Sequence, residues 1–202
     1  TRGNRADHTG NATCADSDLR IALSGGACNA GEQCLIKSVV VAVCLVANSA
    51  HAADFYFCWQ GSNGYSMTGQ MTINPTALNK PVVTQSDVIL FKIAGYQDAQ
   101  LLGKWDMESL QDTTSWLHNY DPGRSVFMTP GEMGLGVSQA WNAGGTATDC
   151  GDPGFGFNLG NYAQDFCLNG TWVEESGMPP ETPFLVSPVP VDPLCRVYTP
   201  TS

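Results

Sequence analysis

A short apolar run followed by small residues limits which part of this chain can form a folded domain. A basic residue precedes the apolar segment 39–47, and the small residues Ala50 and Ala52 follow it. A basic start, a short apolar core and small residues at positions −3 and −1 of a cleavage point are typical of an export signal. The apolar segment is shorter than the roughly 20 residues of a transmembrane helix. The sequence therefore predicts a signal peptide at 35–52, with Ala53 as the first residue of the exported protein.

The residues before this segment have no pattern that predicts a folded element. Residues 1–34 show neither the two-residue period of a strand nor the 3.6-residue period of a helix. No Met occurs before Met67, so we expect translation to start near Leu35 and residues 1–34 to be a non-native leader or a disordered extension. The alternative is that the apolar segment 39–47 is a buried strand of a larger fold.

The cysteines predict two disulfides in the exported part, residues 53–202. Four of the eight Cys residues follow the signal, namely Cys58, Cys150, Cys167 and Cys195. Four Cys residues in an exported protein favour two bridges, for which three pairings are possible. We expect Cys150–Cys167, which closes a local Gly-rich loop, and Cys58–Cys195, which links the first strand to the C-terminal segment. A zinc site is the alternative, but the Cys-x-x-Cys pair typical of such sites is absent from the sequence.

Composition favours short strands over long helices. Charged residues make up 14% of the chain, against about 25% in an average globular protein, whereas Gly (22) and Pro (12) are plentiful. Such a chain is poor in the residues of surface helices and rich in turn formers. Two hairpins are predicted, one joining the aromatic segment 55–59 to the alternating segment 65–73, and one with Asn169-Gly170 between 165–168 and 171–174.

Further short strands are predicted between these hairpins. The most apolar segment, 87–94, is expected to be buried more fully than the others and to end in a turn at 95–98. Gly69 falls on the apolar face of its strand, where it lets a neighbouring ring pack closely. Asp106 is expected to cap a helical turn at 106–110. The other predicted strands are 101–105, 115–120, 125–128, 137–141 and 155–157.

The C-terminal tail, 178–202, is rich in proline before Cys195. We expect this tail to be extended over the surface instead of pairing inside a sheet, because proline lacks a backbone N–H donor. About eight short strands joined by frequent turns predict an all-β protein with an antiparallel sandwich or jelly-roll. A small β-barrel is the alternative. Residues 53–202 are expected to form a single domain.

The acidic balance of the chain limits its partners. The formal net charge is −10 at pH 7. A surface of this sign repels nucleic-acid phosphates and anionic lipids. We therefore expect no nucleic-acid partner and no stable membrane insertion after removal of the signal peptide.

Three segments combine aromatic residues with Gly and Cys. They are Phe-Tyr-Phe-Cys-Trp-Gln-Gly at 55–61, Gln-Ala-Trp-Asn at 139–142 and Cys-Gly-Asp-Pro-Gly-Phe-Gly-Phe-Asn at 150–158. These strings resemble small exported proteins of Gram-negative bacteria that have no assigned activity. The resemblance covers most of 53–202 and implies a signal peptide directly before the first strand. It implies no activity.

The sequence contains no recognisable catalytic set. His118 is near Ser115 and Asp121 in the sequence, but no Gly-x-Ser-x-Gly nucleophile motif accompanies them. Glycoside hydrolysis needs two carboxyl groups about 5–10 Å apart in a cleft. Two acid pairs are close in sequence, but such pairs are common on solvated surfaces; they are Asp106 with Glu108, and Glu174 with Glu175. We leave enzyme activity open and favour a protein without one.

Two groups of residues are candidates for binding. Exposed tryptophan rings can stack on sugars, although packing in the core is the competing role; the candidates are Trp59, Trp116, Trp141 and Trp172. Oxygen-rich Gly loops can hold Ca²⁺, although Asp, Asn and Gly also serve ordinary turns; the candidates are Asp149, Asp152, Asn158 and Asp165. No other cofactor is indicated.

Together these features predict a periplasmic or secreted β module that binds a ligand or a component of the cell envelope. One alternative is a small hydrolase acting on an envelope or polysaccharide substrate. Another is a structural or adhesive surface component. A pocket containing a carboxyl group of raised pKa would favour the hydrolase, and a flat stripe of exposed tryptophans would favour sugar binding.

Overall fold

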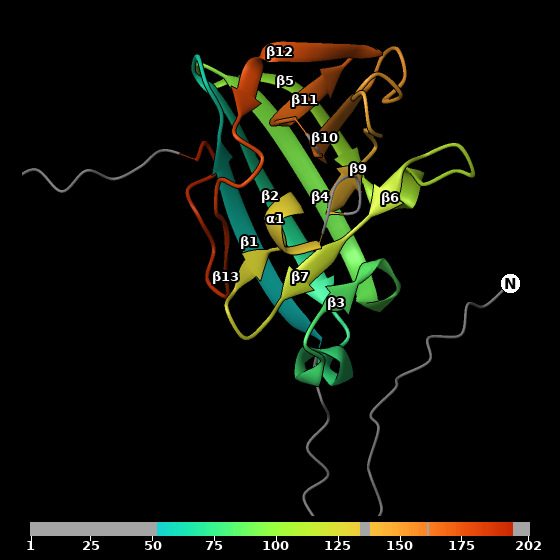
Figure 1. Cartoon of the computed structure of the whole chain (residues 1–202), viewed down its shortest axis with the longest axis vertical. Coiled ribbons are helices and arrows are strands. Elements are labelled where there is room, and N and C mark those ends of the chain that lie inside the picture. The colour runs from blue at the N-terminus through green and yellow to red at the C-terminus, as the bar shows by residue number, and fades with distance from the viewer. Residues whose placement is uncertain (1–51, 134–137, 161, 196–202) are drawn as a thin grey trace, which may run out of the picture. The chain divides into compact units, whose positions relative to one another are not determined.

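The computed structural model describes residues 52–133, 138–160 and 162–195, which form an antiparallel all-β fold with one short α-helix (Figure 1). The predicted all-β class is confirmed. The predicted leader 1–34 and the predicted signal peptide 35–52, apart from Ala52, lie outside the described residues. The first strand begins at Ala53, immediately after the predicted cleavage point. No helix among the described residues is both long enough and apolar enough to cross a membrane.

The strands are arranged in two sheets. In order across the sheet, the eight-stranded sheet consists of β3 (Val83–Thr84), β7 (Asn119–Asp121), β8 (Val126–Phe127), β13 (Phe184–Ser187), β1 (Ala53–Gln60), β2 (Tyr65–Ile73), β4 (Val88–Gln97) and β5 (Gln100–Asp106). The five-stranded sheet consists of β12 (Thr171–Met178), β11 (Gln164–Leu168), β10 (Phe155–Leu159), β9 (Gln139–Trp141) and β6 (Trp116–Leu117). The short helical segments are η1 (Pro75–Asn79), η2 (Gln85–Asp87), η3 (Met107–Ser109) and α1 (Pro130–Met133).

The segment 116–121 passes directly from one sheet to the other. Strand β6 pairs with β9 in the five-stranded sheet, and β7, which begins two residues later, pairs with β3 and β8 in the eight-stranded sheet. His118 lies between them, at the change of sheet. Figure 1 shows the eight-stranded sheet curled into a half-barrel, with the smaller sheet beside β4 and β5. The architecture therefore combines features of the predicted sandwich and of the alternative barrel.

Local sequence signals predicted the hairpins correctly. The hairpin of β1 and β2 pairs over its whole length, from Ala53 opposite Ile73 to Gln60 opposite Ser66. Asn169 and Gly170 have positive φ angles of 51° and 69° and join β11 to β12, as expected for an Asn-Gly turn. The side chain of Asp106 caps the helical turn η3, as predicted.

Two local predictions about β4 were wrong. The predicted turn at 95–98 begins too early, because the strand continues through 95–97 and the chain turns at Asp98 and Ala99, which have positive φ angles of 48° and 69°. The strand is also buried on one face only, since Ile89 is exposed and Lys92 points outward next to buried Phe91. Long apolar runs such as 87–94 do not distinguish one buried face from two.

The prediction for the proline-rich tail was partly wrong. Strand β13 is inserted in the eight-stranded sheet between β1 and β8. The four residues of β13 include no proline, and Phe184 and Val186 alternate into the core. The apolar burial of these two side chains favours pairing over an exposed path. After β13, the chain runs along the outer face of the sheet.

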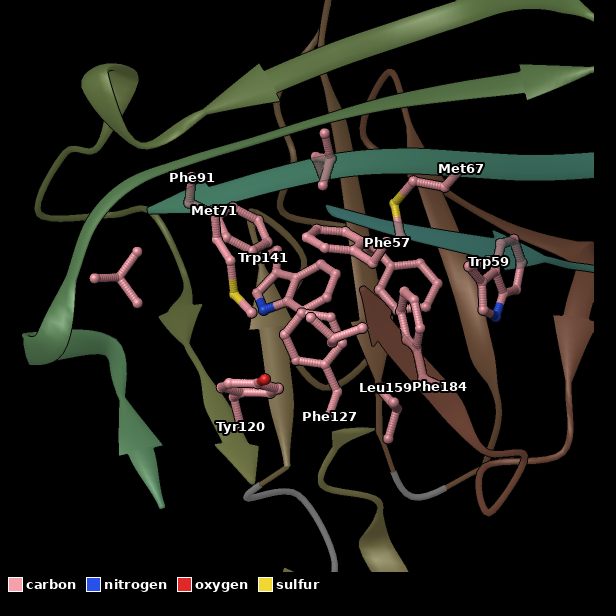
Figure 2. Close-up of a cluster of buried hydrophobic side chains, with 14 of the residues drawn as sticks. Phe57, Trp59, Met67, Met71, Phe91, Tyr120, Phe127, Trp141, Leu159 and Phe184 are labelled. Atoms are coloured by element: carbon pink, nitrogen blue, oxygen red, sulfur yellow. The ribbon is translucent and has the colours of Figure 1, made fainter. Parts of the chain in front are cut away.

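Aromatic side chains fill the space between the sheets (Figure 2). Phe57 lies at the centre of this core, where its ring centroid is 4.9–5.6 Å from those of Phe91, Phe127, Trp141 and Phe184. The contact with Phe91 is stacked and the other three are tilted or edge-on. Aromatic contacts of these kinds add about 0.5–1.5 kcal/mol per pair to the burial of apolar area. The inward faces of both sheets are therefore joined through one set of rings.

Phe155 of β10 packs on a pair of glycines in the other sheet. Gly95 and Gly103 are opposite each other on β4 and β5. A Cβ atom added to Gly95 would lie 2.3 Å from the Phe155 ring, and one added to Gly103 would lie 2.6 Å from Phe155 Cβ. These two glycines therefore allow the second sheet to approach the first closely.

The structure contains both predicted disulfides. Cys58 and Cys195 have Cα atoms 5.3 Å apart, and those of Cys150 and Cys167 are 5.9 Å apart. Two disulfides in one small domain indicate an oxidising location outside the cytoplasm.

Candidate functional site

The outer face of the eight-stranded sheet carries a band of polar side chains. In β1 and β2, inward Phe57 and Gly69 are paired, and outward Tyr56 and Gln70 form the next pair. The same alternation continues into β4 and β5. The outward residues of the band are Tyr56, Thr68, Gln70, Lys92, Tyr96, Lys104 and Asp106.

Residues 188–195, here called the strap, cross this outer face. The disulfide Cys58–Cys195 fixes the end of the strap to β1. Gln60 Nε2 donates to the carbonyl of Cys195 at 2.7 Å, and Thr68 Oγ1 lies 3.5 Å from the carbonyl of Pro193. Because these contacts fix the far end of the strap, it forms a wall beside the polar band.

The strap and the sheet enclose a groove of about 450 Å³. This volume is within the range of about 300–1,000 Å³ that small-molecule sites occupy. Tyr56 and Tyr96 are half-buried beneath it, and Lys92 and Lys104 are exposed along it. The strap contributes apolar surface from Pro190, Val191 and Pro193.

Two lysines line the groove, and Asp106 is the one acidic residue among its described lining residues. Neither Lys92 nor Lys104 forms an ion pair within the described residues. By contrast, Lys80 is 2.6 Å from Asp87, and Arg124 is paired with two carboxylates. The described cations without an anionic partner are therefore both in this groove.

The register of β4 and β5 places these two lysines close together. Lys104 is opposite Ala94, and Lys92 is opposite Asp106, so the lysines are diagonal neighbours on one face. Diagonal Cβ atoms in a sheet are about 7–8 Å apart, within joint reach of two long side chains. One anionic group can therefore contact both ammonium groups. The negative charge of Asp106, opposite Lys92, limits how far along β4 this anionic group can lie.

The four predicted aromatic binding residues are not on one surface. Trp59 and Trp141 belong to the core, where they are 3% and 0% exposed. Trp116 packs against the core from the edge strand β6. Trp172 on β12 is 43% exposed. Packing therefore accounts for three of the four, and only Trp172 can meet a ligand at the surface.

The four predicted calcium-binding residues are also separated. Asp149 accepts a hydrogen bond from the backbone N–H of Gly144 in its own loop, and Asp152 is exposed in the following turn. Asn158 and Asp165 are opposite each other on β10 and β11. No group of three or more His, Cys, Asp or Glu side chains in the described ranges is placed to hold a metal ion.

The structure does bring three predicted residues together in a second, smaller cavity of about 150 Å³. Asn158, Asp165 and Trp172 all line it. Trp172 Nε1 donates to Asp165 Oδ2 at 3.0 Å. Burial raises the pKa of Asp165 to about 7, and the hydrogen bond from Trp172 opposes part of this change.

His118 is a core residue and is not part of a catalytic triad. Its side chain is fully buried, and its ring packs against Phe91, Trp116 and Phe127. Burial lowers its pKa to about 4, so the ring is neutral at pH 7. Its Nε2 lies 3.4 Å from Met71 Sδ, within hydrogen-bonding distance.

Sequence reasoning missed the lysines of the groove. Lys92 lies within the apolar segment 87–94, where the alternation with Phe91 and Ile93 was a signal that one face is polar. The pairing of Cys58 with Cys195 was predicted, but the path of the strap over the outer face was not. That path depends on the insertion of β13, a contact between distant parts of the chain.

Comparison with known proteins adds no relative: no family model, no curated protein and no solved structure matches this chain.

Proposed function

We propose that this protein is an exported, non-enzymatic β module that binds a small anionic ligand in the groove beneath its strap. The observation that supports this most strongly is the position of Lys92 and Lys104. In a chain of net charge −10, the described cations without an ion-pair partner are diagonal neighbours in one groove. Unpaired lysines on a polar sheet face supply N–H donors to a carboxylate, sulfate or phosphate.

The rest of the groove defines the ligand further. Tyr56 and Tyr96 offer ring faces and hydroxyl groups, and Gln70 offers an amide donor and acceptor. The strap adds apolar contacts on one side. A ligand with a ring, several hydroxyl groups and an acidic group can contact the strap, the tyrosines with Gln70, and the two lysines. An acidic saccharide of the cell envelope has this chemistry.

The acidic net charge of the protein favours a short ligand over a long polyanion. A long polyanion such as a nucleic acid would meet the repulsion of the acidic surface beyond the groove. A short acidic oligosaccharide places its charge on the lysines and keeps the remainder near the tyrosines. Either the periplasm or the exterior of the cell would supply such ligands and the oxidising conditions that the two disulfides need.

The alternative of a hydrolase has one favourable observation, the raised pKa of Asp165. Glycoside hydrolysis by two acids needs a second carboxyl group about 5–10 Å away. Asp165 is the one acid among the described residues that line its cavity. We therefore favour binding over hydrolysis.

The test is a calorimetric titration of the oxidised protein with a trisaccharide of galacturonic acid, using the neutral galactose trisaccharide for comparison. The acidic trisaccharide is expected to bind more tightly, and the double variant Lys92→Gln/Lys104→Gln is expected to lose at least about tenfold in affinity. Lys80→Gln is the matched control, because Lys80 lies outside the groove.

Three results would contradict the proposal. The first is equal affinity for the acidic and the neutral trisaccharide. The second is unchanged binding by the double variant, which would place the ligand elsewhere. The third is an equal loss of affinity with Lys80→Gln, which would reduce the effect to net charge.

A further inference from the structure

The smaller cavity lies on the outer face of the five-stranded sheet. Phe157 and Phe166 are paired and point into the core, so the next pair, Asn158 and Asp165, faces outward. The disulfide Cys150–Cys167 holds the loop that precedes β10 against this face. The lining residues are Gly145, Thr146, Asn158, Tyr162, Ala163, Asp165 and Trp172.

Asp165 lines this cavity, and one of its carboxyl oxygens has no hydrogen-bond partner among the described residues. The residue is 3% exposed, and its Oδ2 accepts the indole N–H of Trp172. Its Oδ1 is buried and has no hydrogen-bond partner among the described residues. A buried carboxyl oxygen without a partner costs free energy, which a donor entering the cavity would recover.

No Lys, Arg or His is among the described residues that line this cavity. Among the described lining residues Asp165 is the one charged group, and Tyr162 is the one other titratable group. The pKa of Asp165 is raised by burial, with no charged neighbour contributing to the change. A ligand that carries the missing positive charge would therefore stabilise the ionised carboxylate.

The walls of the cavity suit a cation with an alkyl chain. Tyr162 is 85% exposed and Trp172 is 43% exposed, although both are large aromatic residues. Aromatic faces attract ammonium groups and also contact methylene groups. Asn158, opposite Asp165 in the ladder, places an amide side chain beside the carboxyl group.

We propose that the cavity formed by Asn158, Asp165, Tyr162 and Trp172 is a second binding site, which takes the ammonium group of a primary alkylamine. The ammonium group donates hydrogen bonds to Asp165 Oδ1, and the alkyl chain lies against Trp172 and Tyr162. The cavity holds about 150 Å³, about five times the volume of a water molecule, and therefore fits a four-carbon amine. Free amines and the lysine side chain of a partner protein share this chemistry.

The test follows the indole N–H resonance of Trp172 by NMR while n-butylamine is added to the oxidised protein. The signal is assigned from its disappearance in Trp172→Phe. We expect n-butylamine to shift it in a saturable manner and n-butanol, which has the same shape without the charge, to leave it in place. Nα-acetyl-lysine amide is titrated in parallel; shifts with both amines point to any primary amine, and a stronger response to the lysine derivative points to a protein partner.

Two variants make the test specific to the carboxylate. Asp165→Asn keeps the acceptor for Trp172 but cannot ionise, and it is expected to weaken n-butylamine binding at least about tenfold. Glu174→Gln removes a charge from the same strand as Trp172 outside the cavity and should leave binding unchanged. Wild-type affinity should also fall about tenfold between pH 7.5 and pH 6, as Asp165 gains its proton.

The proposal is overturned if n-butanol shifts the resonance as n-butylamine does, because the site would then be an apolar pocket. It is also overturned if Asp165→Asn binds n-butylamine as well as the wild type, or if Glu174→Gln loses as much affinity as Asp165→Asn.

Discussion

The ring of Phe57 lies over Gly69, its partner on the neighbouring strand, and occupies the space that a side chain at position 69 would need. A Cβ atom built on Gly69 would be 2.1 Å from the Phe57 ring. Phe57 in turn contacts four other aromatic rings at the centre of the core (Figure 2). The absence of a side chain at Gly69 therefore leaves room for the Phe57 ring, against which the rest of the core packs.

Gly69→Ala is expected to lower the free energy of unfolding by about 1–3 kcal/mol, because the added methyl group forces Phe57 away from its neighbours. Urea denaturation measures the change. Gly145→Ala is the matched control, since no heavy atom lies within 4 Å of a Cβ atom built there. Equal stability of both variants would mean that Phe57 has room to move.

His118→Leu is expected to change how stability depends on pH. The His118 pKa is about 4 in the folded protein and 6.5 without burial, so the unfolded chain binds the proton more tightly. This residue therefore destabilises the fold as pH falls from about 6.5 to 4, by about 3 kcal/mol in all. Denaturation of the variant between pH 7 and pH 4.5 should lack that loss. Parallel pH profiles of wild type and variant would contradict a buried neutral histidine.

Asp165→Asn should reveal that Asp165 has the opposite effect on how stability depends on pH. The pKa of Asp165 is about 7 in the folded protein and 3.8 without burial, so here the folded chain binds the proton more tightly. Its contribution to stability is complete below about pH 4 and is lost as pH rises through 7, by at most about 4 kcal/mol. The variant should therefore gain stability relative to the wild type between pH 4 and pH 8. A constant difference across this range would show that Asp165 titrates normally.

The two disulfides are expected to affect different sites. Replacing Cys58 and Cys195 by Ser opens a loop of 137 residues, with a loss of about 5 kcal/mol of stability, and releases the strap. Replacing Cys150 and Cys167 opens a loop of 17 residues, with a loss of about 3 kcal/mol, and releases the loop over Asp165. The first change should weaken binding of the acidic trisaccharide and the second should weaken binding of n-butylamine. Isothermal titrations of folded samples measure both affinities. If each double variant lost affinity for both ligands, or for neither, the two disulfides would not support separate sites.

Features encoded by neighbouring residues were predictable from the sequence. The alternation at 65–73 gave the bounds of β2, and Asn169-Gly170 gave the turn between β11 and β12. The pairing of Cys150 with Cys167 was also accessible, because a short loop favours their contact. In these places the local chain determines its own conformation.

Apart from the pairing of Cys58 with Cys195, features that depend on distant contacts were not predictable. Strand β13 enters the sheet between β1 and β8, which are far from it in sequence. The groove needs that insertion, the path of the strap and the register that places Lys92 beside Lys104. The cavity at Asp165 likewise needs a bridged loop to cover a sheet face. Periodicity identifies which residues share a face of one strand but not which strands become neighbours.

The most direct test of the anionic groove is acetylation of lysine residues in the oxidised wild-type protein, read by mass spectrometry with and without the galacturonic acid trisaccharide. The ligand is expected to protect Lys92 and Lys104 together and to leave the modification rate of Lys80 unchanged. Full modification of Lys92 and Lys104 at a ligand concentration that saturates the protein would contradict this expectation.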